Sequence, residues 1–287
     1  MRFWGIMKIR FWGTRGSIPV PGRDTNIYGG NTTCLEITLR SGKTVIIDAG
    51  TGIRHLGDKL KNENENVDIH LLITHIHWDH NMGFPFFAPI YNPSTRISVD
   101  GHQNCMKGLR NTLDNKTGDG FFPIKFNDLK AHISHLDQVK KGILDIDGTL
   151  IDSIPLQHPQ GGVGFRFREG NKVLVFITDN ELRGDAQGGI SSKEYETFCK
   201  DADILIHDSQ YVPREIKERF GWGHSDYRAT FDMAYRARVK QLVLFHHDPS
   251  RTDHEVKAIK VLCEDLAKKR DSDMTIQAAK EDTELEL

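Results

Sequence analysis

The chain has 287 residues, enough for a sizeable hydrophobic core in one large domain or two smaller ones. Its formal net charge of −2 excludes a globally basic protein, so we expect no broad electrostatic grip on long nucleic acid, although a local basic pocket is not excluded. The four cysteines lie far apart and form no C-x-x-C pair, which favours reduced thiols over a disulfide framework.

Apolar runs with β-strand character begin near the N-terminus and return in the second half of the chain, where helical patterns separate them. This order indicates sheets that are covered by helices on their outer faces. The predicted strands are 8–11, 35–39, 44–47, 69–73, 97–99, 163–167, 173–177, 204–206, 242–245 and 275–278. The predicted helices are 191–200, 225–239 and 254–268, and Ser225 is placed to cap the second of them.

The segment from residue 81 to about 139 is less regular, and we predict short strand and helix fragments with long loops there. Because no low-complexity linker interrupts the sequence, we expect residues 1–287 to form a single domain. The acidic tail after Asp282 is predicted to be loosely held.

The first seven residues lack the continuous apolar stretch and the small-residue cleavage site of a signal peptide. No run approaches the roughly 18 apolar residues of a membrane span. We therefore predict a cytoplasmic protein with no membrane contact. The tetrapeptide Arg-Phe-Trp-Gly occurs at 2–5 and again at 10–13, so Met7 is an alternative to Met1 as the start of the chain.

The segment Thr74-His-Ile-His-Trp-Asp-His80 has the pattern H-x-H-x-D-H and directly follows the apolar strand 69–73. A strand end is a rigid support from which these side chains can be directed at one point. Imidazole and carboxylate groups suit zinc, manganese and iron, and no cysteine lies close in sequence. We therefore predict that the segment binds metal through His75, His77, Asp79 and His80.

Three more candidate ligands lie just after apolar strands further along the chain. They are His158 after Ile154-Pro-Leu-Gln157, Asp179 after strand 173–177, and His246 after strand 242–245. Their positions allow all three to converge on one edge of a sheet.

Taken in the order H-x-H-x-D-H, His, Asp, His, these residues resemble the metallo-β-lactamase superfamily, and in particular its binuclear phosphodiesterases. The resemblance covers nearly the whole chain, since residues 11–19, 30–34 and 46–52 are similar to the opening strands and turns of that family. Ile206-His-Asp-Ser-Gln210 and Gly223-His-Ser225 resemble two motifs of the ribonuclease Z branch, the second of which carries a catalytic histidine.

The resemblance implies an α/β fold, a four-layered αβ/βα sandwich with two central mixed sheets and the metals at one edge between them. It also implies two divalent ions, zinc or else manganese or iron. His75, His77 and His158 would bind one ion, Asp79, His80 and His246 the other, and Asp179 would bridge them. His247 is the alternative to His246, which we prefer because it matches the spacing of the motif and because Asp248-Pro249 begins the next turn.

By the same resemblance, the chain is a metal-dependent hydrolase in which a metal-bound hydroxide attacks phosphorus in line with the leaving oxygen. We predict that His224 protonates the leaving group as a general acid. Asp79 would orient the attacking water in addition to binding metal. Asp208 would hold the His224 loop or polarise its imidazole.

One departure from the ribonuclease Z pattern bears on the substrate. Those enzymes carry a long substrate-gripping insertion between the isolated histidine and the bridging aspartate, whereas only about twenty residues separate His158 from Asp179. We therefore predict a small-molecule nucleotide substrate, a cyclic phosphodiester such as a 3′,5′-cyclic nucleotide. The alternatives are a nuclease acting on RNA ends or oligonucleotides, a hydrolase of carbon esters, thioesters or lactams, and a non-catalytic nucleotide sensor. Relatives of this kind are often dimers, which leaves a homodimer open.

Overall fold

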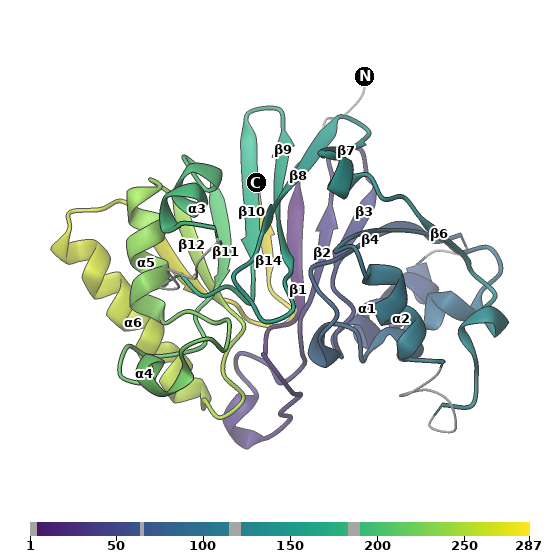
Figure 1. Cartoon of the computed structure of the whole chain (residues 1–287), viewed down its shortest axis with the longest axis horizontal. Coiled ribbons are helices and arrows are strands. Elements are labelled where there is room, and N and C mark those ends of the chain that lie inside the picture. The colour runs from purple at the N-terminus through teal and green to yellow at the C-terminus, as the bar shows by residue number, and fades with distance from the viewer. Residues whose placement is uncertain (1–4, 64–65, 115–121, 183–189) are drawn as a thin grey trace.

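Two seven-stranded β-sheets face each other across the centre of the molecule, and helices lie on the outer side of each sheet (Figure 1). This computed structural model describes residues 5–63, 66–114, 122–182 and 190–287. The layers run helix, sheet, sheet, helix, and both sheets contain parallel and antiparallel neighbours. The predicted four-layered sandwich with two mixed sheets is confirmed.

The first sheet has the strand order β14-β1-β2-β3-β4-β5-β6. Its antiparallel part is β14 to β3 and its parallel part is β3 to β6. The strands are β1 Lys8–Gly13, β2 Cys34–Thr38, β3 Thr44–Ile47, β4 Asp68–Ile73, β5 Arg96–Gly101, β6 His132–His135 and β14 Glu284–Glu286.

The second sheet has the order β13-β12-β11-β10-β9-β8-β7, with antiparallel pairing from β7 to β10 and parallel pairing from β10 to β13. The strands are β7 Ile143–Ile146, β8 Thr149–Pro155, β9 Val163–Glu169, β10 Lys172–Ile177, β11 Ile204–Asp208, β12 Gln241–Phe245 and β13 Thr275–Ala278. All ten strands in the predicted set are present, and the short strand predicted before His158 is the end of β8, whereas β6, β7 and β14 were not predicted.

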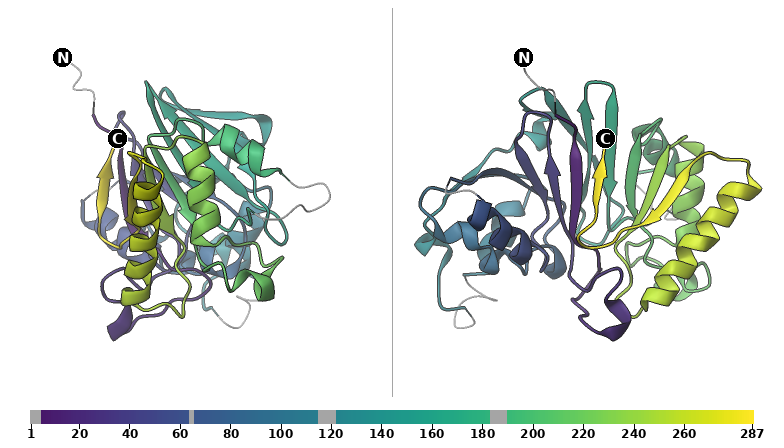
Figure 2. Two further views of the ribbon diagram at one scale, coloured as in Figure 1. Left: turned by 90° about the vertical axis from the view of Figure 1, so that its left-hand side faces the viewer. Right: turned by 180° about the vertical axis from the view of Figure 1, so that it is seen from behind.

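The helices cover the outer faces, and Figure 2 shows α5 and α6 side by side against the second sheet. The α-helices are α1 Ile53–Glu63, α2 Cys105–Asn111, α3 Ser192–Phe198, α4 Ile216–Arg219, α5 Tyr227–Arg236 and α6 Asp253–Lys269. Short 3-10 helices are η1 Arg23–Thr25, η2 Trp78–His80, η3 Phe84–Phe86, η4 Ala88–Tyr91, η6 Phe126–Asp128 and η7 Val139–Lys141. No helix of the described part of the chain is long and apolar enough to cross a membrane.

Three apolar clusters hold these layers together. The central one lies between the sheets, where Phe245 of the second sheet has its ring centroid 6.2 Å from that of Phe11 in the first. The other two lie beneath the helices on either side. Burial of such apolar surface is the main force that stabilises the fold and fixes the ends of the strands in space.

The start of α5 differs from the prediction. The cap is Asp226, whose carboxylate accepts hydrogen bonds from the backbone N–H groups of Arg228 and Ala229. Ser225 is buried and donates its hydroxyl to the carbonyl of Asn180 instead. Both residue types are good helix caps, so the sequence alone left a one-residue ambiguity.

The tail after Asp282 was predicted to be loose, and this was wrong. Strand β14 pairs in antiparallel fashion with β1, with Ile9 opposite Leu285, and the two lie side by side in Figure 2. Leu287 is only 9% exposed and joins the central core, while Lys8 forms ion pairs with Glu284 and Glu286. The alternation of glutamate and leucine is that of an edge strand with one charged and one apolar face.

Removing residues 284–287 is expected to lower the free energy of unfolding by about 2 kcal/mol, because the buried side chain of Leu287 is lost and β1 becomes an open edge. Urea denaturation measures this. The control is Glu286→Gln, which alters an exposed charge and should change stability by less than about 0.5 kcal/mol. An unchanged urea midpoint for the truncated chain would mean that residues 284–287 do not contribute to the stability of the fold.

Candidate metal centre

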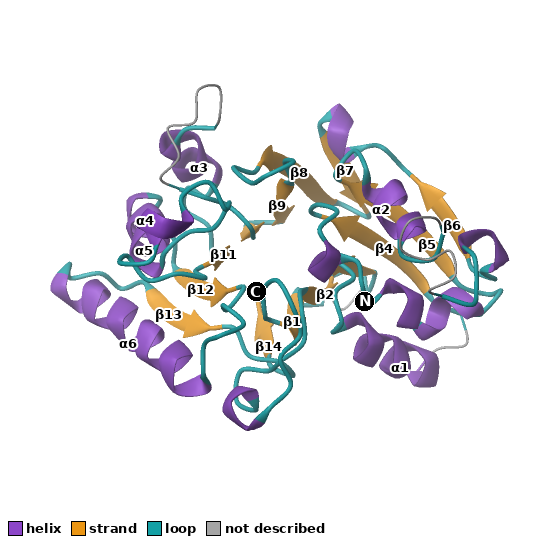
Figure 3. Cartoon of the chain, turned by 60° about the horizontal axis from the view of Figure 1, so that its bottom comes forward, coloured by secondary structure: helices purple, strands orange, loops and turns teal. Residues whose placement is uncertain are grey.

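Polar side chains gather where strands of both sheets end, and Figure 3 looks toward this end of the sandwich. Asp48 comes directly after β3, Asp179 is the second residue after β10, and His246 comes directly after β12. Each has a positive φ, of 60°, 55° and 56° respectively. Such a backbone costs non-glycine residues about 1–3 kcal/mol each, so the surrounding structure must hold these three residues in place.

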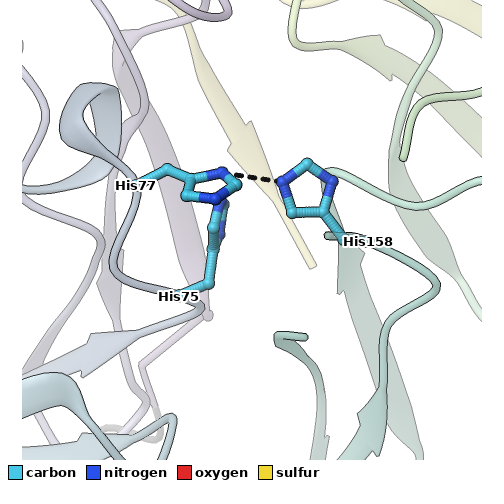
Figure 4. Close-up of side chains that lie close together, drawn as sticks. All are labelled: His75, His77 and His158. Atoms are coloured by element: carbon cyan, nitrogen blue, oxygen red, sulfur yellow. Dashed lines mark hydrogen bonds between the residues drawn. The ribbon is translucent and has the colours of Figure 1, made fainter. Parts of the chain in front are cut away.

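The first cluster contains His75, His77 and His158 (Figure 4). His77 Nδ1 and His158 Nε2 face each other at 2.8 Å, although the two residues come from different sheets. Asp179 adjoins this cluster, since its Oδ2 atom lies 3.6 Å from His75 Nε2 and 3.8 Å from His158 Nε2.

The second cluster contains Asp79, His80, Asp179 and His246, all buried. Asp79 Oδ2 lies 3.3 Å from His80 Nε2 and 3.4 Å from His246 Nε2. Asp179 Oδ1 lies 3.4 Å from His80 Nε2 and 3.1 Å from His246 Nε2. The two carboxylate oxygens of Asp179 are thus divided between the clusters, and the structure brings together all seven residues that the sequence predicted as ligands.

The donor atoms fit divalent metal ions. The Nε2 atoms of His75, His80 and His246 are buried and have no hydrogen-bond partner, an arrangement that is costly unless another group binds them. Convergent imidazole nitrogens and carboxylate oxygens are the donor set of zinc and of similar transition metals.

The charge state of the histidines also suits a cation. Burial lowers the pKa of His75 well below its usual value and that of His158 to about 4, so both are neutral with a free lone pair at physiological pH. Burial also disfavours a charge on His80, but Asp79, Asp179 and Asp48 outweigh this and raise its pKa, so a metal ion that binds there would displace a proton from the imidazole. The second cluster therefore has an excess of negative charge that attracts a positive ion.

Each of these imidazoles is oriented through its other ring nitrogen. His75 Nδ1 lies 3.1 Å from Thr74 Oγ1, and His80 Nδ1 is hydrogen-bonded to Asp48 Oδ2 at 2.7 Å. Asp48 is completely buried and also accepts hydrogen bonds from the N–H and hydroxyl groups of Thr74. Contacts of this kind fix the tautomer and leave Nε2 directed at the cluster.

The remaining imidazoles are held in the same way. His77 Nε2 is hydrogen-bonded to Gln160 Oε1 at 3.1 Å, and His246 Nδ1 to Gln210 Oε1 at 2.9 Å. His158 Nδ1 donates to the carbonyl of Gly223 at 3.0 Å. No role for Asp48, Gln160 or Gln210 was predicted from the sequence. Asp48 and Gln210 lie inside motifs that resemble the family, whereas no sequence pattern marks Gln160.

Asp48→Asn is expected to weaken metal binding about 10- to 100-fold, because a neutral amide holds the His80 imidazole less firmly and lowers its basicity. Competition with a chelator measures the affinity. The control is Asp58→Asn, the same change on the exposed face of α1. Equal affinities in both variants would show that the hydrogen bond of Asp48 does not support the site.

His224 lies beside the clusters rather than inside either of them. It is 7% exposed, its Nδ1 atom lies 3.4 Å from Asp208 Oδ2 and 4.0 Å from Asp179 Oδ2, and its ring stacks on His246. With His158 and Asp179 it forms a third group with the spacing of metal donors. Burial opposes a charge on His224, but the carboxylates of Asp208 and Asp179 raise its pKa above the usual value.

Asp208 makes both contacts that the sequence predicted. Its Oδ2 atom accepts a hydrogen bond from the N–H of Ser225 at 3.0 Å and also faces the His224 ring. A second buried carboxylate, Glu181, was not predicted. Its Oε2 atom accepts from the N–H groups of Gly221 and Gly223, at 2.9 and 3.0 Å, so it fixes the loop that precedes His224.

The two adjacent histidines after β12 make different contacts. His246 belongs to the second cluster, whereas Nε2 of His247 is hydrogen-bonded to the carbonyl of Ala279 at 2.9 Å. Burial lowers the pKa of His247 to about 3, as expected for a neutral structural histidine. The geometry thus agrees with the prediction of His246.

A four-layered sandwich whose edge carries two donor clusters around one shared carboxylate defines a metal-dependent hydrolase. A family profile described as "Beta-lactamase superfamily domain" matches residues 43–247. Because this match covers most of the chain, the protein belongs to the beta-lactamase superfamily.

Similarity to individual proteins covers most of the chain. The sequence is 24% identical over 308 aligned positions to ribonuclease Z of Thermococcus kodakarensis, covering 91% of this chain and 90% of that protein. The fold is similar to the metallo-beta-lactamase fold protein YhfI from Bacillus subtilis, with a TM-score of 0.71, 16% identity, and 98% and 100% of the two chains covered. Unliganded yeast PDE1 also has a TM-score of 0.71, with 13% identity and 99% and 100% coverage.

Proposed function

We propose that the protein is a metal-dependent phosphodiesterase that hydrolyses a small cyclic phosphodiester, and that its substrate is a 3′,5′-cyclic nucleotide. The observation that carries this proposal is the position of Asp179, whose two oxygens each face a different donor cluster while His224 lies alongside. A pair of cation sites next to a proton donor suits phosphodiester hydrolysis, because the cations offset the charge of the phosphate and the donor protonates the leaving oxygen.

In this proposal, His75, His77 and His158 would hold one divalent ion, Asp79, His80 and His246 would hold the other, and Asp179 would be shared between them. When bound, two such ions neutralise charge on the phosphate and make water a better nucleophile. The zinc ion is the first candidate, with manganese or iron as alternatives, because imidazole and carboxylate donors suit all three.

The protein's own residues supply the proton chemistry. Because Nδ1 of His224 faces Asp208, its Nε2 atom is left for the leaving oxygen of the substrate. Asp208 and Asp179 raise the pKa of His224 against the effect of burial, which favours the protonated form that a general acid needs. Asp79 is oriented by the N–H of Ser17, which donates to its Oδ2 atom at 2.7 Å, and this carboxylate can align the attacking water.

The preference for a small substrate rests on the segment between His158 and Asp179. It consists of strands β9 and β10, which form a hairpin within the second sheet. Because this hairpin is part of the sheet, the segment has no residues left to form an extended arm that binds a large RNA. The competing proposal, a nuclease acting on RNA ends or short oligonucleotides, is favoured by the similarity to ribonuclease Z over 91% of the chain.

The test is an assay of metal-analysed protein against cyclic mononucleotides, cyclic dinucleotides, short RNA and an activated phosphodiester, with a thioester and a lactam beside them. We expect the highest kcat/KM with a cyclic nucleotide. Faster cleavage of RNA would favour the nuclease. Hydrolysis of the thioester or lactam without any phosphodiester cleavage would contradict the proposal.

We also propose that residues 1–287 form a single domain, because the central core takes side chains from both sheets. A single cooperative unfolding transition is expected. Light scattering on the same sample tests the homodimer that the family resemblance suggests.

A further inference from the structure

Two exposed tryptophans lie on the segments that border the metal centre. Trp78 is 51% exposed and Trp222 is 59% exposed, whereas Trp12 is buried. Indole rings are large and apolar, and they are usually covered by other parts of the protein. Two half-exposed indoles on segments that border one site are therefore available to a ligand.

Trp78 is part of the metal-binding motif itself. It lies between His77 and Asp79 and begins the 3-10 helix Trp78–His80. This turn places Asp79 and His80 in the buried cluster and leaves the indole in solvent. The position of Trp78 is therefore fixed by the residues that form the site.

Trp222 is also held in place, in the loop that precedes His224. It lies between Gly221 and Gly223, which have φ values of 81° and 83°, in the left-handed region that favours glycine. The buried carboxylate of Glu181 binds the N–H groups of both glycines. The carbonyl of Gly223 in turn accepts the hydrogen bond from His158 Nδ1.

The two tryptophans thus flank one contact of the site. Trp78 adjoins His77, and Trp222 adjoins the glycine that binds His158, while His77 and His158 lie 2.8 Å apart. A ligand whose phosphate lies at the clusters would therefore come close to both segments that carry the indoles. An exposed loop that is fixed by a buried carboxylate presents its ring in a defined place, which lowers the entropy lost on binding.

We infer that Trp78 and Trp222 form an aromatic clamp that binds the planar base of the substrate by stacking, so that the enzyme selects phosphodiesters bearing a nucleobase. This inference rests on the proposed function and names its substrate class. Every base has a flat π-face, so stacking on tryptophan selects nucleotides over sugar phosphates without a strong preference for one base.

The test compares adenosine 3′,5′-cyclic monophosphate with the corresponding ribose cyclic phosphate that lacks the base. Trp78→Ala and Trp222→Ala are each expected to raise KM for the nucleotide by about 5- to 100-fold, the range that loss of one stacking contact gives. KM for the base-free substrate should stay unchanged, and Trp→Phe at either position should restore most of the affinity. The matched control is Leu262→Ala, which removes an exposed apolar side chain on α6.

Equal changes for both substrates, or no change for either, would overturn the clamp. If the wild-type protein cleaves neither substrate, the proposed function is contradicted. The clamp is then tested separately, by fluorescence. Adenosine monophosphate should quench the tryptophan fluorescence of the wild-type protein, and this quenching should disappear in the Trp78→Phe, Trp222→Phe double variant. Absence of quenching in the wild-type protein would overturn the clamp whatever the activity.

Discussion

Asp179→Asn is expected to abolish hydrolysis and to reduce the amount of tightly bound metal from two ions to one or none. The carboxylate oxygens of Asp179 face different donor clusters, with Oδ2 near His75 and Oδ1 near His246. Asparagine has a single oxygen, and its NH₂ group repels a cation at the other position. Loss of the metal contribution, worth several kcal/mol in the transition state, corresponds to a fall in kcat of about 1,000-fold or more.

Metal analysis after dialysis and a thermal unfolding series with added zinc measure this effect. Zinc at about 100 times its dissociation constant should stabilise the wild-type protein by about 2.7 kcal/mol, and the variant much less. Asp201→Asn is the control, since Asp201 is an exposed carboxylate that pairs with Arg238. If Asp179→Asn keeps two tightly bound ions, the carboxylate does not bridge them.

His224→Ala is expected to keep both metal ions and to lower kcat about 100- to 10,000-fold, the usual contribution of a general acid. His224 belongs to neither of the two main clusters but lies close to Asp179. Without a proton donor, the leaving oxygen must depart as an alkoxide. A substrate with a p-nitrophenolate leaving group needs no proton, so its hydrolysis should suffer much less.

The pH dependence of kcat is a second test of the role of His224. Because the general acid works only when protonated, activity should fall as the pH rises through the pKa of His224, which Asp208 and Asp179 raise against the effect of burial. Asp208→Asn should move this alkaline limb to lower pH, and His224→Ala should remove it. His254→Ala, at an exposed histidine on α6, is the control. Loss of metal in His224→Ala would make His224 a ligand instead.

Much of the fold could be predicted because its strands are strongly apolar. Strands such as β4 and β12 are buried on both faces, so each appears as a continuous apolar run. Strands β6, β7 and β14 are short, and several of their side chains are exposed, so they give weaker signals. Helix α1 was also missed, although Ile53, Leu56 and Leu60 follow helical spacing in the sequence.

The candidate site could be predicted for the same reason, since its seven residues stand immediately beyond such strands or in a compact motif. The supporting contacts could not. Asp48 reaches a histidine 32 positions away, and Glu181 binds a loop about 40 positions away. Hydrogen bonds of this kind depend on how the layers pack, and no local pattern marks them.

The amino-acid sequence by itself therefore determined which side chains stand at strand ends and what chemistry they offer, because hydrophobic periodicity and motif spacing are local properties. The tertiary structure decided which neighbour faces the site, as His246 and His247 illustrate. Successive side chains at the end of a strand point to opposite sides, and only the packing of the two sheets sets which side is the metal centre.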